Sequence, residues 1–184
     1  MGERGLTMAF GSQKGQRVTR SDSFLRDAMA TWGSMVYGLA LVRTCSAEDA
    51  QDVYQDVFVR LATDGTAFAD EDHLKAWLIR ATINRCCDVA RSAWRRRTVP
   101  LSELTVEPVD ASADAAASLE ARELWEAVAR LGPKMREAVY LHYAEGLSCE
   151  EIAKLAGVRP STVRTRLQRA RGRLQSMLGG SPDD

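Results

Sequence analysis

The sequence predicts an all-α fold of two small helical domains joined by a flexible linker, the C-terminal one a helix-turn-helix. Apolar residues recur at helical spacing along most of the chain, and no stretch alternates convincingly between apolar and polar residues as a strand would. Over residues 98–117 the composition changes to two prolines, many small residues and several acids, which is typical of a linker. We therefore expect domains at 23–97 and 118–178, a flexible tail at 1–22 and a short tail at 179–184.

Three helices are expected in the first domain. The first spans about residues 23–43, and Ser46 then caps the second, because its hydroxyl can accept a hydrogen bond from the first turn. After the polar loop at 63–70, a third helix spans about 71–97 and ends before Pro100.

Four further helices are expected in the second domain, where glycines separate the apolar patterns. They span about residues 118–131, 133–144, 148–156 and 161–178. Ser148 and Glu151 form a capping box that starts the third of them. Gly157 then permits the positive φ of a tight turn, and Val163 packs the last helix back on its neighbour. With Ser161 as the cap of the last helix, this spacing predicts a helix-turn-helix.

Charge is strongly segregated along a chain that is formally neutral, with 25 basic and 25 acidic residues. Residues 48–72 hold eight acids against one base, and residues 80–97 hold six arginines against one acid. Residues 159–174 hold six arginines and no acid. Such asymmetry usually indicates different partners for different surfaces.

The last predicted helix has an apolar side and a polar side. On a helical wheel the apolar side comprises Val163, Leu167, Ala170 and Leu174. Opposite lie Thr165, Gln168 and Gly172, with Arg169 close by and further arginines at 164, 166, 171 and 173 on the two flanks. Short polar groups with one arginine suit base edges in a DNA major groove, and outer arginines suit phosphates. The alternatives are a solvated basic face or a helix that binds membranes or calmodulin, which the lack of a large apolar face with Trp or Phe disfavours.

The third predicted helix also carries a polar strip opposite its apolar face. This strip consists of Trp77, Arg80, Ala81, Asn84, Arg91 and Arg95, with Arg85 beside it. A tryptophan and an asparagine among arginines suit single-stranded nucleic acid, whose unpaired bases can stack and form hydrogen bonds. The alternatives are ordinary packing for Trp77 and a merely solvated face for the arginines.

The second predicted helix has the opposite sign of charge. Its face away from the core comprises Glu48, Asp49, Asp52, Gln55, Asp56 and Val59. Phosphates would repel this face, so it cannot lie on DNA. It is either solvated surface or a docking site for a basic protein, with Val59 adding an apolar contact.

No metal site, cofactor or catalytic site is predicted. The four cysteines lack metal-ligand spacing and are interpreted as buried thiols in a reducing cytoplasm. No apolar run approaches the roughly 18 to 20 residues that cross a bilayer, so no membrane insertion is expected. The N-terminus also lacks the apolar core of a signal peptide.

Three successive segments resemble the conserved regions of extracytoplasmic-function RNA polymerase sigma factors. They are SAEDAQDVYQDVFVRL, AWLIRATINRCCDVARSAWRRR and LGPKMREAVYLHYAEGLSCEEIAKLAGVRPSTVRTRLQRARGRL. The resemblance covers nearly everything from residue 23 to residue 178, in order, with a divergent linker where the family diverges. It implies that the chain is a dissociable specificity subunit of RNA polymerase rather than an enzyme.

The resemblance also implies a role for each surface. Contacts with the clamp of the polymerase β′ subunit fall on Asp49, Asp52, Gln55, Asp56 and Phe58, although Phe58 lies toward the core side of the wheel. Contacts that open and read the promoter −10 element fall on Arg80, Asn84, Arg85 and Arg91. Contacts with the −35 element fall on Ser161, Thr162, Arg164, Thr165, Gln168, Arg169 and Arg171. Members of the family are commonly held by an anti-sigma factor, although no residue of this sequence identifies one.

Two features depart from the family pattern. His142 occupies a place where similar proteins can carry a phosphate-contacting arginine, so that contact depends on the charge of the imidazole. The loop before the third helix, which contains Phe68, is more acidic than a site beside an extruded base would be.

Two other functions are compatible with parts of the sequence. A two-domain helix-turn-helix regulator that never binds polymerase would be recognised by a dispensable acidic helix. A recombinase or nuclease would need a nucleophilic Ser or Tyr with supporting arginines, or clustered carboxylates for two metal ions. The tyrosines at 37, 54, 140 and 143 instead lie in apolar helical patterns.

Overall fold

The computed structural model describes residues 20–96 and 115–179. All regular elements within these ranges are helices, which confirms the predicted all-α class. Nearly all of the expected N-terminal tail, most of the expected linker and the end of the C-terminal tail lie outside the described residues. No helix in the described ranges combines the length and the apolar character needed to cross a bilayer.

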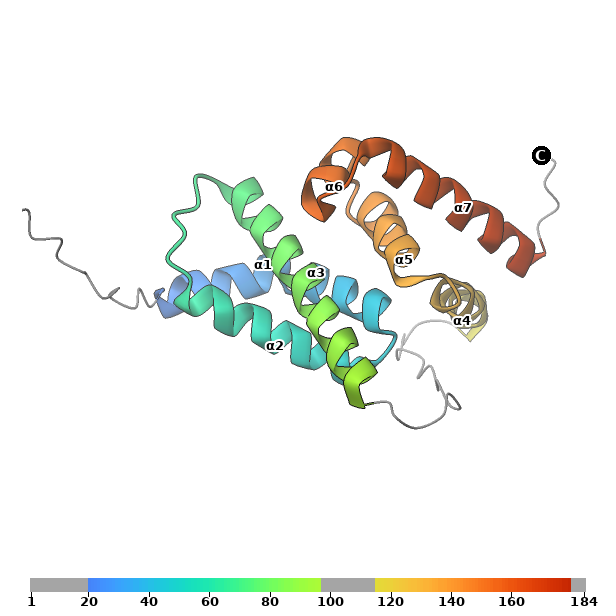
Figure 1. The fold of residues 1–184 in the computed structure, drawn as a ribbon. Coiled ribbons are helices and arrows are strands. Elements are labelled where there is room, and N and C mark those ends of the chain that lie inside the picture. Colours follow the sequence, from blue (N-terminus) through green and yellow to red (C-terminus); the bar gives the residue numbers. More distant parts are fainter. Residues whose placement is uncertain (1–19, 97–114, 180–184) are drawn as a thin grey trace, which may run out of the picture.

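Three helices form the N-terminal group, namely α1 (Asp22–Thr44), α2 (Ala47–Thr63) and α3 (Glu71–Arg96) (Figure 1). Fully buried apolar side chains from all three helices meet between them, among them Leu39, Val53, Leu61 and Leu78. The Ser46 hydroxyl accepts a hydrogen bond from the Asp49 N–H at 3.2 Å, so Ser46 caps α2 as predicted.

Five helical segments form the C-terminal group, namely α4 (Ala115–Ala129), α5 (Pro133–Val139), the π-helical turn η1 (Tyr140–Ala144), α6 (Cys149–Ala156) and α7 (Pro160–Leu178). The expected single helix at 133–144 is thus α5 followed by η1. The Glu145 N–H bonds to the Tyr140 carbonyl, five residues back, which widens the last turn. The spacing of apolar residues does not distinguish an α-helical turn from a π-helical turn, so the sequence pattern did not predict η1.

The helix-turn-helix of α6 and α7 forms as predicted, with one correction. The Ser148–Glu151 capping box is present, and Gly157 has φ 64° and ψ 38°. However, Arg159 rather than Ser161 is the N-cap of α7, and Pro160 occupies the first turn. The ring of a proline at that position already holds the helical φ, so the helix begins before Ser161.

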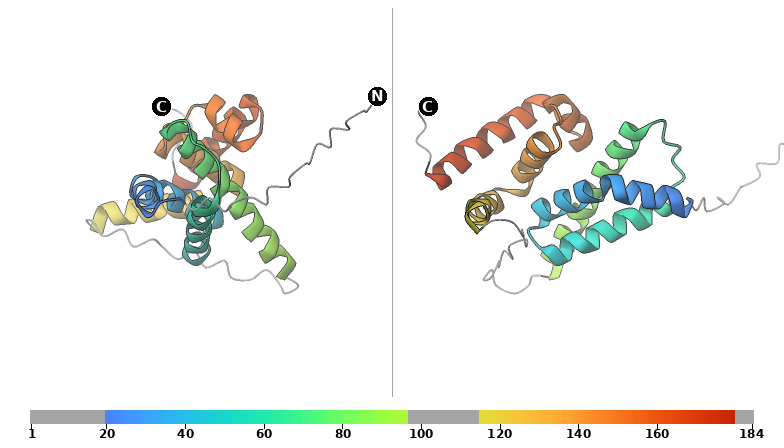
Figure 2. Two further views of the ribbon diagram at one scale, coloured as in Figure 1. Left: turned by 90° about the vertical axis from the view of Figure 1, so that its left-hand side faces the viewer. Right: turned by 180° about the vertical axis from the view of Figure 1, so that it is seen from behind.

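The two helical groups pack directly against each other, mainly through α1 with α5 and α3 with α6 (Figures 1 and 2). At the centre of this contact the Arg43 guanidinium pairs with the Glu137 carboxylate, and the two side chains are only 8% and 4% exposed. Closer to the surface, Lys75 Nζ lies 3.2 Å from Glu145 Oε2. Tyr140 of η1 packs against Gly38 of α1, where a Cβ atom would collide with the phenol.

A second buried arginine, Arg136, joins the two helical groups through hydrogen bonds to backbone carbonyls. Arg136 of α5 donates hydrogen bonds to the carbonyls of Val42 and Arg43 at the end of α1. It also donates to the carbonyls of Ala129 and Leu131 before α5. Three of these acceptors lie in the last turns of α1 and α4, where carbonyls have no partner within the helix, and Leu131 follows α4. Arg136 therefore satisfies polar groups of both helical groups at once.

Candidate functional surfaces

The acidic face of α2 is exposed to solvent. Its surface positions are Glu48, Asp52, Gln55, Asp56 and Val59, and the Val59 side chain is 65% exposed. Asp49 is half-buried in the first turn. An exposed valine among acids is the composition expected of a surface that docks a basic partner with some apolar contact.

Phe58 does not lie on this face. It is 6% exposed, and its ring centroid lies 4.9 Å from that of Tyr54 in the core of the N-terminal group. The structure therefore corrects the assignment of Phe58 as a direct contact. Its role is to pack α2 against its neighbours and so to orient the acidic face.

The polar strip of α3 is exposed at Arg80, Asn84 and Arg91. Ala81, which the wheel placed in the strip, is instead 5% exposed and contributes to the core. Trp77 is half-buried: the Phe68 ring lies edge-on to it at 6.0 Å, and the Arg60 guanidinium lies over it at 5.7 Å. The structure therefore supports the alternative interpretation of Trp77, in which its ring packs against neighbouring side chains.

One ion pair joins the acidic face to the α3 strip. Arg85 Nε lies 2.6 Å from Asp56 Oδ2, and both side chains are well exposed, at 39% and 48%. Exposed pairs of this kind contribute about 0–1 kcal/mol, so either partner can exchange the other for a ligand at little cost. The sequence placed these two residues in separate interfaces, and only the packing of α2 on α3 brings them together.

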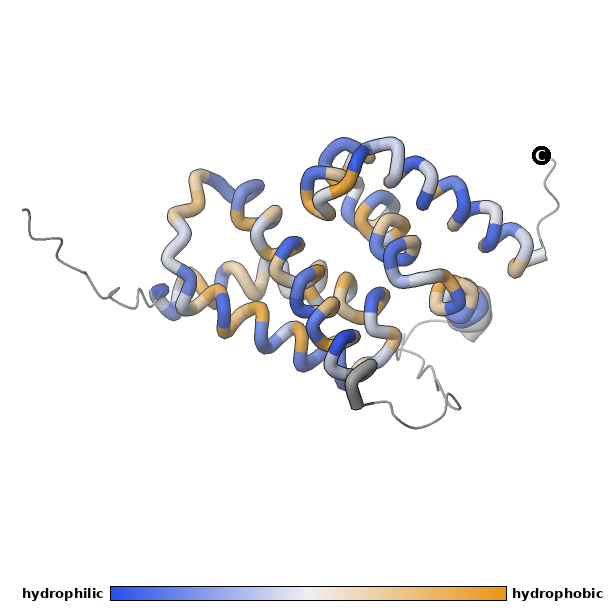
Figure 3. Tube along the Cα trace, in the orientation of Figure 1, coloured by the Kyte–Doolittle hydropathy of each residue, from blue (hydrophilic) through white to orange (hydrophobic). Residues whose placement is uncertain are grey.

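The polar face of α7 is turned to solvent. Val163, Leu167 and Ala170 are buried, whereas Ser161, Arg164, Thr165, Gln168, Arg169 and Arg171 are exposed and Thr162 is half-buried. Along α7 the residues are mostly hydrophilic (Figure 3). The predicted wheel of this helix is confirmed.

An open hollow of about 400 Å³ lies beside the first turns of α7. Its walls combine predicted −35 contacts, two flanking arginines and one methionine, in full Met135, Ser161, Thr162, Thr165, Arg166, Arg169 and Arg173. Burial, together with the positive charge of Arg43, lowers the pKa of the Arg166 guanidinium. Arg166 and Arg173 belong to the flanking arginines of the helical wheel, which the sequence predicts to suit phosphates.

Arg164 bridges the two helices of the helix-turn-helix. Its guanidinium pairs with the Glu150 carboxylate in the first turn of α6. Both side chains are more than half exposed, so the pair is weak and Arg164 can turn to a phosphate when one is present.

His142 lies in the π-helical turn. Its Nδ1 is 2.8 Å from the Leu147 carbonyl, which fixes the proton on Nδ1 in the neutral ring, and its ring lies 4.8 Å from that of Tyr143. The imidazole thus holds the loop before α6. A phosphate would have to be reached through Nε2.

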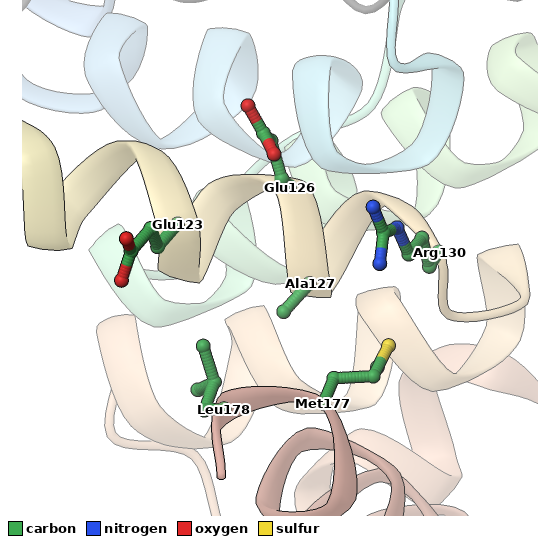
Figure 4. Close-up of a pocket in the computed structure, with 6 residues that line it drawn as sticks. All are labelled: Glu123, Glu126, Ala127, Arg130, Met177 and Leu178. Carbon is green, nitrogen blue, oxygen red and sulfur yellow. The ribbon is translucent and has the colours of Figure 1, made fainter.

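A second hollow, of about 270 Å³, lies between α4 and the end of α7 (Figure 4). Ala127, Met177 and Leu178 form its apolar part, and Glu123, Glu126 and Arg130 its charged part. None of the predicted contact residues borders it, so it is separate from the polar face of α7.

The cysteines take no part in these surfaces. All four are free thiols, and burial raises the pKa of Cys86 to about 11. The thiol therefore stays protonated and unreactive near neutral pH. Within the described ranges, no three His, Cys, Asp or Glu side chains gather closely enough to hold a metal ion.

The fold and the exposed basic helix define a DNA-binding protein of the helix-turn-helix class. Residues 29–96 match the family model described as Sigma-70 region 2, and residues 121–174 match Sigma-70, region 4. The chain is 34% identical over 145 residues to the ECF RNA polymerase sigma factor SigM of Mycobacterium tuberculosis, which covers 78% of this chain and 71% of SigM. It is 28% identical to the RNA polymerase sigma factor CarQ of Myxococcus xanthus, over 86% of this chain and 90% of CarQ.

The fold is also found among solved structures. The sigma factor RpoE in its complex with the anti-sigma factor NepR from Bartonella quintana superposes with a TM-score of 0.68 at 23% identity, covering 86% of this chain and 98% of RpoE. CnrH, in complex with the cytosolic domain of CnrY, gives a TM-score of 0.61 at 25% identity, over 88% and 91% of the two chains.

The chain belongs to the extracytoplasmic-function (ECF) RNA polymerase sigma factors. It therefore binds core RNA polymerase and directs promoter recognition and transcription initiation. This membership rules out the regulator that never binds polymerase, and it is consistent with a non-enzymatic initiation factor rather than a recombinase or nuclease.

Proposed function

We propose that the acidic face of α2 is the surface that docks on the clamp of the polymerase β′ subunit. The observation that carries this proposal is the exposure of Asp52, Gln55 and Asp56 around a 65% exposed Val59. Among the described residues Asp52 forms no ion pair, so its charge is available to a basic partner. A negative face also keeps this side of the molecule away from promoter phosphates.

The α3 strip then engages the −10 element once its strands separate. Arg80 and Arg91 supply positive charge for the backbone, and the Asn84 amide supplies a donor and an acceptor for an unpaired base. Arg85 joins them by exchanging Asp56 for a phosphate. Half-buried Trp77 supports this surface from below through Phe68 and Arg60.

The polar face of α7 reads the −35 element in the major groove. Thr165, Gln168 and Arg169 point at base edges, and Arg164 and Arg171 contact the flanking phosphates. Their exposure around a buried Val163–Leu167–Ala170 side supports this division of roles.

Both elements cannot be bound while the two helical groups remain packed together. By their names, the −35 and −10 elements are centred about 25 positions apart, which corresponds to roughly 85 Å at the roughly 3.4 Å rise of each base pair. The contact through Arg43, Glu137 and Arg136 must therefore open on the promoter. The covalent tether between the two groups then raises the effective concentration of the second contact once the first has formed.

This proposal also places the protein in the cytoplasm, where the core polymerase works, and gives it no catalytic step of its own. An anti-sigma factor is the further partner that we propose. RpoE of Bartonella quintana, which shares this fold, was solved with its anti-sigma factor NepR.

The docking surface is tested by reversing Asp52 to lysine. Asp52→Lys is expected to weaken binding to bacterial core RNA polymerase about tenfold or more, because a like charge replaces an attraction at a contact centre. Affinity is measured by titrating core enzyme against the fluorescently labelled chain. Glu71→Lys, at the exposed start of α3, is the matched charge control. Equal affinity of wild type and Asp52→Lys would reject the docking assignment.

The −10 surface is tested with the double variant Asn84→Ala, Arg91→Ala. Transcription by the reconstituted holoenzyme over a promoter library first identifies a promoter. On that DNA the double variant is expected to bind polymerase normally but to lose most permanganate reactivity of the −10 thymines. Melting equal to wild type would remove α3 from the mechanism.

A further inference from the structure

Arg20 lies just before the N-cap of α1 and reaches the end of α2 and the loop that follows it. Its backbone N–H donates to the Ala62 carbonyl at 3.1 Å. Its Nε donates to the Leu61 carbonyl at 3.2 Å, and a terminal guanidinium nitrogen donates to the Thr66 carbonyl. One half-buried residue therefore joins the start of α1, the end of α2 and the loop at 64–70.

The same guanidinium also lies against two aromatic rings. Its carbon is 4.8 Å from the Phe24 centroid and 4.6 Å from the Phe68 centroid. Phe68 in turn lies edge-on to His73 at 5.5 Å and to Trp77 at 6.0 Å. Arg20 thus fixes both the backbone of the loop, at Thr66, and its one aromatic side chain.

The other hydrogen bonds of the loop are local. The Thr66 N–H donates to Asp64 Oδ1 at 2.8 Å, and the His73 N–H donates to Asp70 Oδ1 at 2.7 Å. These bonds shape the two ends of the loop. The Asp64 N–H also donates to the Leu61 carbonyl of α2 at 3.4 Å, but among the described residues only Arg20 ties the loop to the start of α1 through hydrogen bonds. Arg20 supplies that tie with a planar fork of donors, which a lysine cannot reproduce.

The loop leads directly into the α3 strip. Trp77, against which Phe68 packs, lies one turn before Arg80, so a displaced loop would change the surface beside the strip. The loop and the first turn of α3 are acidic, with Asp64, Asp70, Glu71 and Asp72. Held in place, these carboxylates stay in their turns and at the helix start rather than swinging toward a nucleic-acid backbone.

We propose that Arg20 is a positioning residue for the −10 interface, because its bonds to Leu61 and Thr66 and its contact with Phe68 hold the loop at 64–70 against Trp77, at the start of the α3 strip. The assignment rests on the proposed function of α3. Arg20 precedes the part of the chain that matches region 2, which begins at residue 29. Arg20 itself does not contact DNA.

The test compares Arg20→Ala and Arg20→Lys with Arg26→Ala in the full chain bound to core polymerase. Arg26 is an exposed arginine of α1, so its variant removes the same charge without touching the loop. The probe is the single-stranded non-template −10 segment of the promoter selected above, labelled with fluorescein. Two further affinities, for core polymerase and for the −35 duplex, are measured in parallel.

Arg20→Ala is expected to weaken binding of the single strand about tenfold, the size expected for the loss of one or two hydrogen bonds that hold a loop. Binding to polymerase and to the −35 duplex should not change. Amide hydrogen exchange across residues 64–70 should become faster. Arg20→Lys should resemble Arg20→Ala in both respects, and Arg26→Ala should resemble wild type.

Three results would overturn the proposal. One is unchanged single-strand affinity in Arg20→Ala. Another is full affinity in Arg20→Lys despite fast exchange of the loop, which would show that charge alone matters. The third is an equal loss in all three affinities, which would show general unfolding. If Asn84→Ala, Arg91→Ala also leaves single-strand binding intact, the proposed function of α3 fails as well, so the two failures are distinguishable.

Discussion

Individual arginines in this protein have different tasks according to what surrounds them. Arg43 and Arg136 are buried and satisfy a carboxylate and backbone carbonyls. Arg20 is half-buried against two rings, whereas Arg169 and Arg171 are exposed on α7. Since all carry the same charge, burial and partners decide which of them are available to DNA.

At this scale we predict that Arg169 and Arg171 make different kinds of contribution to DNA binding. Arg169→Ala should cost about 1–3 kcal/mol at the matched −35 site and relax the preference at one base, because Arg169 faces base edges. Arg171→Ala should weaken binding to all DNA sequences about equally, because Arg171 neutralises one phosphate. It should also reduce the slope of log affinity against log salt concentration by roughly one. Affinities for each single-base variant at several salt concentrations separate the two effects.

The control for this pair is Arg130→Ala. Arg130 is an exposed arginine directly after α4 that borders the other hollow, so its loss should change neither base preference nor salt slope. If Arg171→Ala alters base preference and Arg169→Ala does not, the helix lies in the groove with a different rotation.

Individual helices in this protein are stabilised by hydrogen bonds at their ends as well as by packing of their apolar faces. In α6, which has only eight residues, the Ser148 hydroxyl accepts from the Glu151 N–H at 3.2 Å. The Glu151 carboxylate accepts from the Ser148 N–H at 2.8 Å and from its hydroxyl at 2.7 Å. So short a helix depends on these bonds and on packing, because isolated helices of this length are unstable.

At the scale of this element we predict a pH-dependent contribution from Glu151. The Ser148 hydroxyl and backbone N–H hold the pKa of Glu151 below its ordinary value of 4.5. The folded state therefore gains stability that is fully present above that value and is lost as the pH falls through the lower folded pKa. Chemical unfolding monitored between about pH 3 and pH 6 should show this loss.

Glu151→Gln and Ser148→Ala are the matched variants. Each removes the low-pKa carboxylate or its partner, so each should flatten this part of the pH dependence. An acid destabilisation that is identical in wild type and both variants would assign it to other carboxylates.

In the whole molecule, the contact between the two helical groups contains two ion pairs. The Arg43–Glu137 pair is almost fully buried, and the Lys75–Glu145 pair is partly exposed, at 19% and 15%. Removing one partner of a buried pair costs about 3–5 kcal/mol, because the remaining charge is left without compensation. A single substitution in this pair can therefore open the contact between the two helical groups.

At this scale we predict that Glu137→Gln separates the two groups. Small-angle X-ray scattering of the free protein should give a larger radius of gyration than that of wild type, with helix content unchanged by circular dichroism. Glu145→Gln, at the exposed edge of the same contact, should change the radius far less. A lower melting temperature without any expansion would show that Glu137 stabilises its own domain instead.

The sequence alone determined the all-α class, the helix-turn-helix and the polar face of α7. Val163, Leu167 and Ala170 recur at helical spacing, Ser148 and Glu151 are three residues apart, and Gly157 lies where a turn needs positive φ. These signals are local, and neighbours along the chain impose the conformation whatever the rest of the fold does. For the same reason the acidic face of α2 and the exposed part of the α3 strip were predictable.

Only the tertiary structure decided which residues meet across the chain. It paired Asp56 with Arg85, placed Arg43 on Glu137 and brought Arg20 to Thr66. Helical periodicity gives the direction of a side chain around its own axis, but not which helix lies opposite. An arginine on a predicted face can therefore be a DNA contact, a buried clamp or a support for a loop, and only the packing of the helices tells these apart.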